Sequence, residues 1–542
     1  MLSTMQDVPL TVTAIMRHAV SFNADRTVTT ARGDGAYRTA TYREIGAQAA
    51  QLAHALRGLG ITGDQRVGTF MWNNAEHLAA YLAIPSMGAV LHTLNIRLLP
   101  EQIAYIANEA EDQVVIADLS LAAQLAPVLP QLSTVHTVIA VGEGDLGPLQ
   151  ASGKAVLRYD EILAGLPTDF DWPELDERSA AAMCYTSGTT GNPKGVVYSH
   201  RSSFLHSLAT CTTNTLGVSS DDVALPIVPM FHANAWGLPY AALMAGADLV
   251  MPDRFLDGAS LINLIETCRP TVAAAVPTIW NDVQHCLEKA PGHDISSLRL
   301  VACGGSAVPL SLMQSFQQRH GVYIQQLWGM TETSPMATTA KPLPGVSEKQ
   351  HWATRATQGR PVCGVDVRIV DDGGAALPND GVAVGELEVR GPWITGGYYL
   401  GLDADKFDSG WLRTGDVGRI DESGFVTLTD RAKDVIKSGG EWISSVDLEN
   451  HLIAHPAVLE AAVVGVPDER WQERPLVAVV LHEGATATPQ ELRDFLADKV
   501  VRWWLPERWT FIERVPRTSV GKYDKKTIRA QYADGAYEVT TL

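Results

Sequence analysis

The chain has 542 residues, which suggests three or four packed units at roughly 150 residues each. Its 46% share of hydrophobic residues allows a large core, but no apolar run is long enough to span a membrane and no leader pattern occurs. A net charge of −19 argues against nucleic acid as a partner. The 6 cysteines form no Cys-x-x-Cys pair, which predicts buried, reduced thiols in a cytoplasmic protein.

Helices alternate with short apolar strands up to about residue 340. Residues 42–59 and 75–87 have helical patterns, and residues 66–71, 89–94 and 114–117 have strand patterns. The alternation returns between residues 223 and 303. This order predicts an α/β fold in which helices cover both faces of parallel sheets.

The pattern changes after about residue 359. Short β-rich runs at residues 365–370, 384–390 and 425–429 are separated by glycine turns and predict a small β-barrel-like unit. Beyond residue 430, helices at 445–454 and 489–500 and strands at 461–465 and 477–481 predict a compact α+β domain. We therefore divide the chain into residues 1–430, with a body to about 359 and a β unit over 360–430, and residues 431–542.

Two segments are rich in glycine. Gly58, Gly60 and Gly63 have the dinucleotide spacing, but they follow a helix and precede a strand, so they predict a helix end and a turn. Residues 185–195 instead follow an apolar strand at 180–184 and combine three glycines, four hydroxyls and Lys194. Glycine lets backbone N–H groups approach phosphate oxygens, so this loop predicts an anion site; Pro193 excludes a Walker P-loop.

The segment 185–195 closely resembles the phosphate loop of the adenylate-forming enzymes, which include acyl-CoA synthetases, luciferases and peptide-synthetase adenylation domains. Further motifs of the family follow in its order at residues 228–236, 304–309, 328–335, 410–416, 430–442 and 516–522. The resemblance extends over nearly the whole chain. It is strongest to fatty-acyl-CoA synthetases and methylthiopropionate-CoA ligases, through residues 437–450.

The resemblance implies the following nucleotide site. Phosphate-loop residues are Thr186, Ser187, Gly188, Thr189, Thr190, Gly191 and Lys194. The nucleotide pocket comprises Gly304, Gly305, Ser306, Gln326, Leu327, Trp328, Gly329 and Met330. Trp328 lies beside adenine, where the family more often has tyrosine, and Asp416 and Arg431 bind ribose. Thr331 binds the α-phosphate, and Glu332 and Thr186 approach Mg²⁺, which prefers oxygen ligands.

The resemblance also implies how the acid and coenzyme A bind. Lys522 contacts the carboxylate and the α-phosphate, where positive charge must screen two anions. His232 helps to close the acyl pocket, and Trp236, expected on the same face of a helical turn, gates it. Lys433 is the hinge of a mobile C-terminal domain. Residues expected to contact the adenylate or coenzyme A are Lys437, Gly439, Gly440 and Trp442.

The residues alone leave structural alternatives open. Lys522 could simply be an exposed lysine in a basic tail. His232 and Trp236 could serve only in packing, and Asp416 could be a turn aspartate. Together with the resemblance they predict an acid–CoA ligase that uses ATP, Mg²⁺ and coenzyme A on a medium- or long-chain fatty acid. The alternatives are a short-chain acid ligase such as a methylthiopropionate–CoA ligase, a carrier-loading domain, a luciferase-like oxygenase and a non-catalytic nucleotide-binding regulator. Related synthetases suggest a homodimer.

Overall fold

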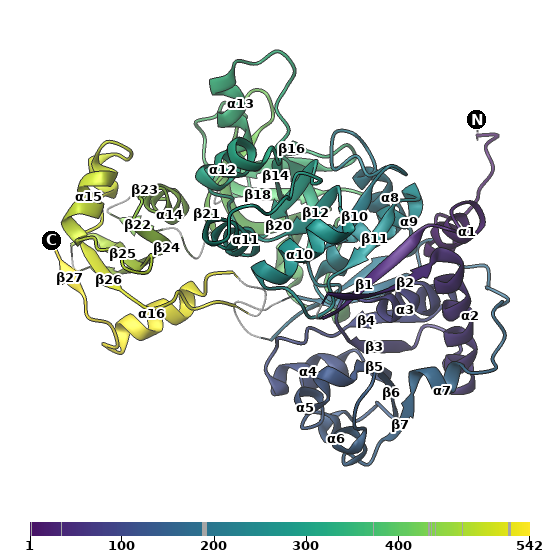
Figure 1. Cartoon of the computed structure of the whole chain (residues 1–542). Coiled ribbons are helices and arrows are strands. Elements are labelled where there is room, and N and C mark those ends of the chain that lie inside the picture. The colour runs from purple at the N-terminus through teal and green to yellow at the C-terminus, as the bar shows by residue number, and fades with distance from the viewer. Residues whose placement is uncertain are drawn as a thin grey trace.

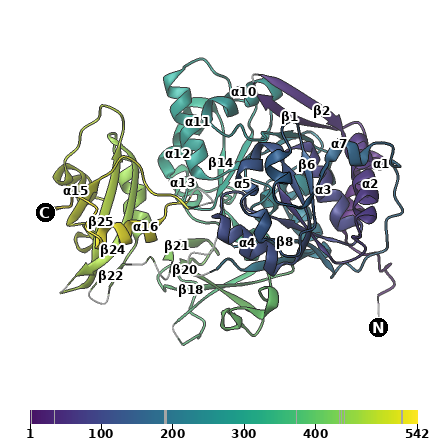
Figure 2. The same ribbon diagram turned by 90° about the horizontal axis from the view of Figure 1, so that it is seen from below.

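The computed structural model describes the chain except residues 2, 34, 187–191, 372, 432–433, 435, 439–440, 469 and 519–521. The side chains of residues 430, 431, 437, 441 and 442 are also outside the description. A large N-terminal α/β part carries an antiparallel sheet, and a small C-terminal domain stands beside it in both views (Figure 1 and Figure 2). The predicted fold class is confirmed.

Two largely parallel sheets form the body. The first has the order β7-β6-β5-β3-β4-β8-β9, with β9 antiparallel to β8. Its strands are β3 (Arg66–Phe70), β4 (Val90–Thr93), β5 (Asp112–Asp118), β6 (Thr137–Val141), β7 (Ala155–Arg158), β8 (Ala180–Tyr185) and β9 (Gly195–Ser199).

The second sheet has the order β16-β15-β14-β13-β12-β10-β11-β1-β2 and is parallel from β14 to β1. Its strands are β1 (Thr27–Gly33), β2 (Ala36–Thr41), β10 (Val223–Pro226), β11 (Asp248–Met251), β12 (Val272–Ala275), β13 (Leu300–Gly304), β14 (Ile324–Gly329), β15 (Met336–Thr339) and β16 (Arg360–Pro361).

Helix α3 (Ala75–Ser86) is buried along its whole length, because it is apolar on nearly all sides and packs against strands of both sheets. The core cluster around it extends into both sheets and includes Leu78, Leu91 and Leu249. The other helices of this part are α1 (Val12–Phe22), α2 (Tyr42–Gly58), α4 (Pro100–Glu109), α5 (Ala122–Leu125), α6 (Gly147–Gln150), α7 (Tyr159–Leu163), α8 (His200–Thr210), α9 (Leu238–Ala245), α10 (Gly258–Cys268), α11 (Pro277–Lys289), α12 (Leu310–His320) and α13 (Glu348–Arg355).

The β-rich unit is an antiparallel sheet in which β18 pairs β17 and β20, and β20 pairs β19 and β21. Its strands are β17 (Asp366–Val370), β18 (Gly385–Arg390), β19 (Phe407–Asp408), β20 (Trp411–Ile420) and β21 (Val426–Arg431). The long strand β20 was not predicted as a strand. Its charged outer face hides the usual apolar alternation.

The C-terminal domain has its own sheet and core. The strands are β22 (Ile436–Ser438), β23 (Glu441–Ile443), β24 (Val458–Asp468), β25 (Gln472–Leu481), β26 (Arg508–Phe511) and β27 (Thr540–Thr541), and the helices are α14 (Ser445–Ile453), α15 (Pro489–Ala497) and α16 (Lys525–Ala533). β21, which ends at Arg431, belongs to the preceding sheet and β22 to this one, so the predicted division between residues 430 and 431 falls at the last residue of β21 and stays a proposal. The domain faces α11 and α12, where the His285 and His482 ring centroids are 6.4 Å apart.

Three smaller expectations have clear outcomes. Helix α2 ends at Gly58, so the first glycine triplet is a helix end, as predicted. All six cysteines are free, but only Cys184 and Cys303 are buried; Cys211, Cys268 and Cys286 are half-buried, and Cys363 is exposed in the loop between β16 and β17, where the prediction of buried thiols is wrong. Within the described part of the chain, no helix is both long and apolar enough to cross a bilayer.

Candidate active site

The carboxyl ends of the parallel strands open onto one cavity of about 160 Å³. Tyr185 ends β8, Gly304 ends β13 and Gly329 ends β14, and the residues beside these ends line the cavity. Crossover connections leave the carboxyl ends of parallel strands free for loops, which is why ligands bind at this edge of α/β sheets. The topology therefore brings segments of distant sequence to one place.

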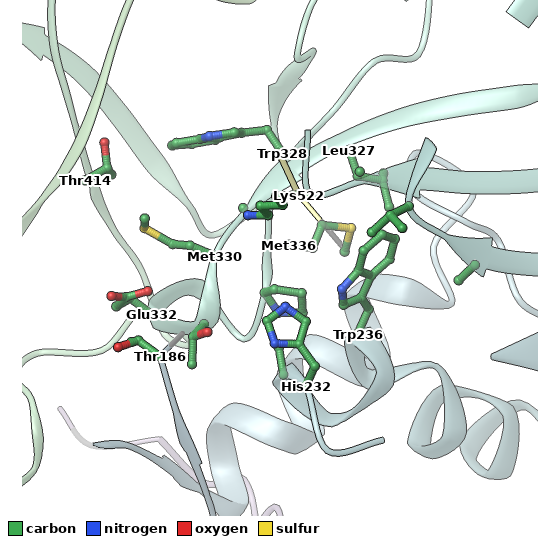
Figure 3. Close-up of a pocket in the computed structure, with 18 of the residues that line it drawn as sticks. Thr186, His232, Trp236, Leu327, Trp328, Met330, Glu332, Met336, Thr414 and Lys522 are labelled. Carbon is green, nitrogen blue, oxygen red and sulfur yellow. The ribbon is translucent and has the colours of Figure 1, made fainter. Parts of the chain in front are cut away.

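The cavity has a charged end and an apolar end (Figure 3). We define the charged end as Thr186, Lys194, Glu332, Tyr398 and Lys406. We define the apolar end as Leu216, Trp236, Leu238, Ala274 and Leu327; Leu216, Leu238 and Ala274 belong to one core cluster, and Trp236 and Leu327 pack against it. Figure 3 shows Lys522 between Glu332 on one side and Trp236 on the other. One cavity thus joins a wall that carries charged side chains to an apolar wall.

The base of the glycine-rich loop is fixed by strand pairing. The Thr186 N–H donates to the Lys194 carbonyl at 2.9 Å, and the Lys194 N–H donates to the Thr186 hydroxyl at 3.1 Å. These bonds continue the antiparallel ladder of β8 and β9. The predicted phosphate contacts of Ser187, Gly188, Thr189, Thr190 and Gly191 lie outside the described residues. The loop therefore leaves and re-enters the sheet at one fixed point on the charged end.

Glu332 sits on a short 3-10 turn, Thr331–Thr333, directly after β14. The Tyr398 hydroxyl donates to Glu332 Oε1 at 2.5 Å, and burial raises the pKa of Tyr398. The Tyr198 hydroxyl donates to the Thr331 carbonyl at 2.7 Å and ties this turn to β9. Two tyrosines thus hold the Thr-Glu segment in place.

Trp328 and Asp416 are joined by a hydrogen bond. The Trp328 indole N–H donates to Asp416 Oδ2 at 2.8 Å, and both residues are largely buried. The tryptophan that stands where the family more often has tyrosine therefore also orients the aspartate predicted to bind ribose. Asp416 pairs with Arg431 in the register of β20 and β21. The Arg431 side chain is outside the description.

Two predicted pocket residues do not line the cavity. The Gln326 amide accepts from the Val308 N–H at 2.6 Å and donates to the Thr357 carbonyl at 2.5 Å, so it braces the loop behind the pocket. Ser306 is exposed. Gly304, Gly305, Leu327, Gly329 and Met330 do line the cavity.

The helical turn expected between His232 and Trp236 is present, but it has the opposite handedness to an ordinary helix. Residues 233–237 all have positive φ, from 43° at Ala233 to 71° at Gly237, so the turn is left-handed. This conformation costs roughly 1–2 kcal/mol for each non-glycine residue. His232, with an extended backbone, and Trp236 nevertheless both reach the cavity wall.

Asn234 anchors the left-handed turn from behind. Its amide oxygen lies 3.2 Å from the Tyr81 hydroxyl and 3.2 Å from the Cys184 thiol, and all three residues are buried. Asparagine is also among the residues that tolerate positive φ best. At Gly237, a Cβ atom would lie 2.6 Å from His206 Nδ1, so only glycine fits there. Buried polar contacts therefore offset strain that presents Trp236 to the apolar end.

Lys522 enters the cavity from the C-terminal domain. The backbone of Thr518 and Lys522 closes a turn, with the Thr518 N–H donating to the Lys522 carbonyl at 2.7 Å. A Cβ atom on Gly305 would lie 3.6 Å from Lys522 Cε, so the lysine passes close to the backbone after β13. Burial, with the charges of Lys522 and Arg97, lowers the pKa of His232 to about 3. A neutral imidazole and a lysine therefore share this part of the wall.

The family is decided by comparison with known proteins. The model of the AMP-binding enzyme family matches residues 16–399, and that of the AMP-binding enzyme C-terminal domain matches residues 447–522. The chain belongs to the AMP-binding enzyme family. This agrees with the phosphate-loop resemblance and with the cavity at the carboxyl ends of the strands.

Relatives of this AMP-binding enzyme span nearly its full length. It is 43% identical to a 3-methylmercaptopropionyl-CoA ligase of Ruegeria pomeroyi, covering 98% of this chain and 99% of that protein. It is 44% identical to a long-chain-fatty-acid–CoA ligase of Thermus thermophilus, covering 98% of this chain and 97% of that protein. It is 41% identical to a medium-chain-fatty-acid–CoA ligase of Ectopseudomonas oleovorans, covering 98% of each protein. The crystal structure of an anthranilate CoA ligase with anthranoyl-AMP matches with a TM-score of 0.88 at 26% identity, covering 98% and 100% of the two chains.

Some functional expectations for this AMP-binding enzyme fall outside the description. Lys433, Gly439 and Gly440 are not described. Lys437 and Trp442 form a cross-strand pair of β22 and β23, but their side chains are outside the description. The hinge and coenzyme A contacts therefore remain predictions.

Among the wall residues that were not predicted from the sequence, three come from one stretch of the AMP-binding enzyme. Tyr398, Lys406 and Thr414 line the cavity but come from the stretch assigned to the β unit. Thr414 lies two residues before Asp416, within the motif at residues 410–416, so this motif was a signal that could have identified it. Tyr398 and Lys406 lie in a glycine-rich connection whose path across the body is set by tertiary packing alone.

Proposed function

We propose that this enzyme is an ATP-dependent carboxylic acid–CoA ligase that forms an acyl-AMP, releases pyrophosphate and transfers the acyl group to coenzyme A. One observation carries the proposal: Lys522 lies in a single cavity between the charged end and the apolar end. A carboxylate and the α-phosphate are both anions, so they approach each other only where positive charge screens them. Lys522 occupies the place where such a pair would meet.

In the proposed first step, Trp328 stacks on adenine and Asp416, oriented by the indole, accepts the ribose hydroxyls. Thr331 binds the α-phosphate, and Thr186 and Lys194 hold the outer phosphates together with the phosphate loop. Lys522 bridges the carboxylate and the α-phosphate while one carboxylate oxygen attacks phosphorus and pyrophosphate leaves. His232 stays neutral because of its lowered pKa, so it packs against the acid without adding charge.

Magnesium fits the charged end. Mg²⁺ is usually held by one or two carboxylates together with substrate phosphates and water. Glu332 would supply the carboxylate and Thr186 a hydroxyl, and both lie on the cavity wall. When bound, the ion would neutralise phosphate charge. Among the described residues, no three His, Cys, Asp or Glu side chains cluster as a metal site, which suits a site completed by ATP.

The second step requires the thiol of coenzyme A to reach the acyl-AMP carbonyl. We propose that the C-terminal domain turns about Lys433, withdraws Lys522 and brings in the segment of Lys437, Gly439, Gly440 and Trp442. Hinges are a few residues at element ends that absorb a change in φ and ψ. In the sequence, Lys433 comes after β21, which belongs to one sheet, and before β22, which belongs to the next. This position supports the proposal.

For the acid, we propose a medium- or long-chain fatty acid. Among the described lining residues, the charged side chains belong to the charged end and to Lys522, and the apolar end has aliphatic and indole walls. Such walls favour an alkyl chain over an amino acid, which needs a partner for its ammonium group. The named activity of the Ruegeria pomeroyi relative keeps a short-chain thioether acid as the second candidate.

The test is pyrophosphate release from ATP and Mg²⁺ with straight-chain acids of about two to about sixteen carbons, methylthiopropionate and aromatic acids, each with and without coenzyme A. We expect the highest kcat/KM with a medium or long chain and an acyl-CoA product. If kcat/KM is highest with methylthiopropionate, the short-chain thioether acid replaces the fatty acid as the proposed substrate. A preference for aromatic acids would overturn both substrate proposals. Pyrophosphate without acyl-CoA would indicate a carrier-loading domain, and no pyrophosphate a binding protein.

Location and assembly belong to the same proposal. Free cysteines throughout the chain support a reducing, cytoplasmic compartment. A homodimer follows only from the related synthetases, and sedimentation velocity of the purified chain tests it.

A further inference from the structure

Lys406 has no role in the reaction proposed above, yet it lines the same cavity as Lys194 and Lys522. It ends a short 3-10 turn, Ala404–Lys406, and is half-buried. The opposing charge on the lining, among the described residues, is Glu332. A wall with this excess of lysines is built for a highly charged anion.

The segment 398–406 is packed firmly against the exit of the phosphate loop. The Tyr398 hydroxyl bonds Glu332, and the Tyr398 ring packs edge-on against Phe407 at 5.5 Å between centroids. A Cβ atom at Gly195, next to Lys194, would lie only 3.0 Å from Tyr399 Cβ. Lys406 is therefore delivered to the cavity by a braced segment, unlike a lysine on a free surface loop.

Lys194 already has an acidic partner in this segment. Its ammonium group forms an ion pair with Asp403, and it lies 5.4 Å from the Tyr398 ring centroid. Asp403 has a positive φ of 47° and a side chain that is 37% exposed. Burial, followed by the charge of Lys406, lowers the pKa of Lys194, so the two lysines are close enough to repel each other. An anion placed between them would remove that repulsion.

We propose that Lys194 and Lys406 together clamp the β- and γ-phosphates of ATP and the leaving pyrophosphate, and that Asp403 holds Lys194 until the nucleotide arrives. The inference rests on the proposed function. Lys522 stands on the side of Gly305 and His232, where it serves the α-phosphate, so the outer phosphates need other cations. Asp403 is exposed enough to return to water when ATP takes its place.

The first test compares ATP with AMP, since AMP shares the adenosine and α-phosphate and lacks the outer phosphates. Calorimetry on the full chain without acid gives both affinities for Lys406→Ala, Lys406→Arg and the exposed control Lys349→Ala on α13. We expect Lys406→Ala to weaken ATP binding about ten-fold and leave AMP binding within about two-fold, because charge-assisted contacts are lost only with the outer phosphates. Lys406→Arg keeps most of the affinity. Equal weakening of ATP and AMP would mean a structural role and overturn the clamp.

The second test concerns Asp403. Asparagine tolerates its positive φ and cannot hold Lys194 by charge. We expect Asp403→Asn to tighten ATP binding about three-fold and to have no such effect in a Lys194→Ala background. Weaker ATP binding by Asp403→Asn would show that Asp403 positions Lys194 for the phosphate and would overturn its role as a placeholder.

Pyrophosphate exchange separates this inference from the function beneath it. If the unaltered enzyme catalyses no exchange of pyrophosphate into ATP with any acid of the panel, the proposed function fails. If it is active and Lys406→Ala keeps the KM values for ATP and pyrophosphate, only the clamp fails. If Lys406→Ala raises both KM values about ten-fold with the KM for the acid unchanged, the clamp is supported.

Discussion

The two ends of the cavity are built in different ways. At the charged end, Thr186, Lys194 and Glu332 come from two short sequence motifs, and hydrogen bonds to tyrosines hold the turn that carries Glu332. The apolar end is collected from separate elements and from the strained turn that carries Trp236. Charges act over several ångströms and need few residues, whereas an apolar wall acts only by contact. We propose that the charged end, with Lys522 beside it, carries the chemistry and that the apolar end sets selectivity, and substitutions test that division.

The largest effect is expected from Lys522→Ala. It removes the charge that screens the two anions, so acyl-AMP formation should fall about 10²–10³-fold. Pyrophosphate exchange measures this step, and thioester formation from supplied acyl-AMP should change little because Lys522 serves only the first step. Lys526→Ala, an exposed lysine of the same tail, is the control. Unchanged exchange in Lys522→Ala would break the assignment of chemistry to this part of the cavity.

A somewhat smaller effect is expected from Glu332→Gln. The amide still accepts the Tyr398 hydrogen bond but lacks the charge for Mg²⁺, so the rate should fall about 10²-fold and half-maximal activity should need more Mg²⁺. A magnesium titration of the exchange rate measures both. Tyr398→Phe keeps the carboxylate, so its exchange rate should fall much less. An equal fall in both variants would mean that the Tyr398–Glu332 hydrogen bond, and not the charge of Glu332, is what the reaction needs.

Trp236→Ala should change selectivity and spare the nucleotide. Removing the indole widens the apolar end, so the ratio of kcat/KM values between a bulky and a slim acid should shift about ten-fold, while the KM for ATP stays within about two-fold. Steady-state rates over the acid panel measure the shift. A changed KM for ATP with an unchanged acid profile would contradict the division between the two ends.

The smallest effect on the rate is expected from pH. Burial lowers the pKa of His77, His200 and His206 to about 4 and that of His232 to about 3. Below the ordinary value of 6.5 the unfolded chain binds protons that the native chain cannot, so stability falls until about pH 4. The loss approaches about 1.4 kcal/mol per histidine for each pH unit. Urea unfolding at pH 7 and 5.5 measures this. Between pH 6 and 8, the rate of pyrophosphate exchange should not depend on the ionisation of His232. A change of rate with pH in this range that His232→Asn abolishes would contradict that.

The sequence determined the fold class and three residues of the charged end, Thr186, Lys194 and Glu332. Alternating helices and strands can bury their apolar faces only as helix-covered parallel sheets, and the carboxyl ends of those sheets meet at one edge. The phosphate-loop strand and the Thr-Glu segment were therefore predictable from local order. Lys522 was predicted only through resemblance, since one lysine in a basic tail has no local pattern of its own.

Tertiary structure alone decided the rest. It turned Gln326 away from the cavity and brought Tyr398 and Lys406 onto its wall. It also wound residues 233–237 left-handed, because buried contacts to Asn234 and the close approach of His206 to Gly237 outweigh the local preference for a right-handed turn. Local patterns record the periodicity of burial along one segment. They do not record which distant side chain will occupy the remaining space.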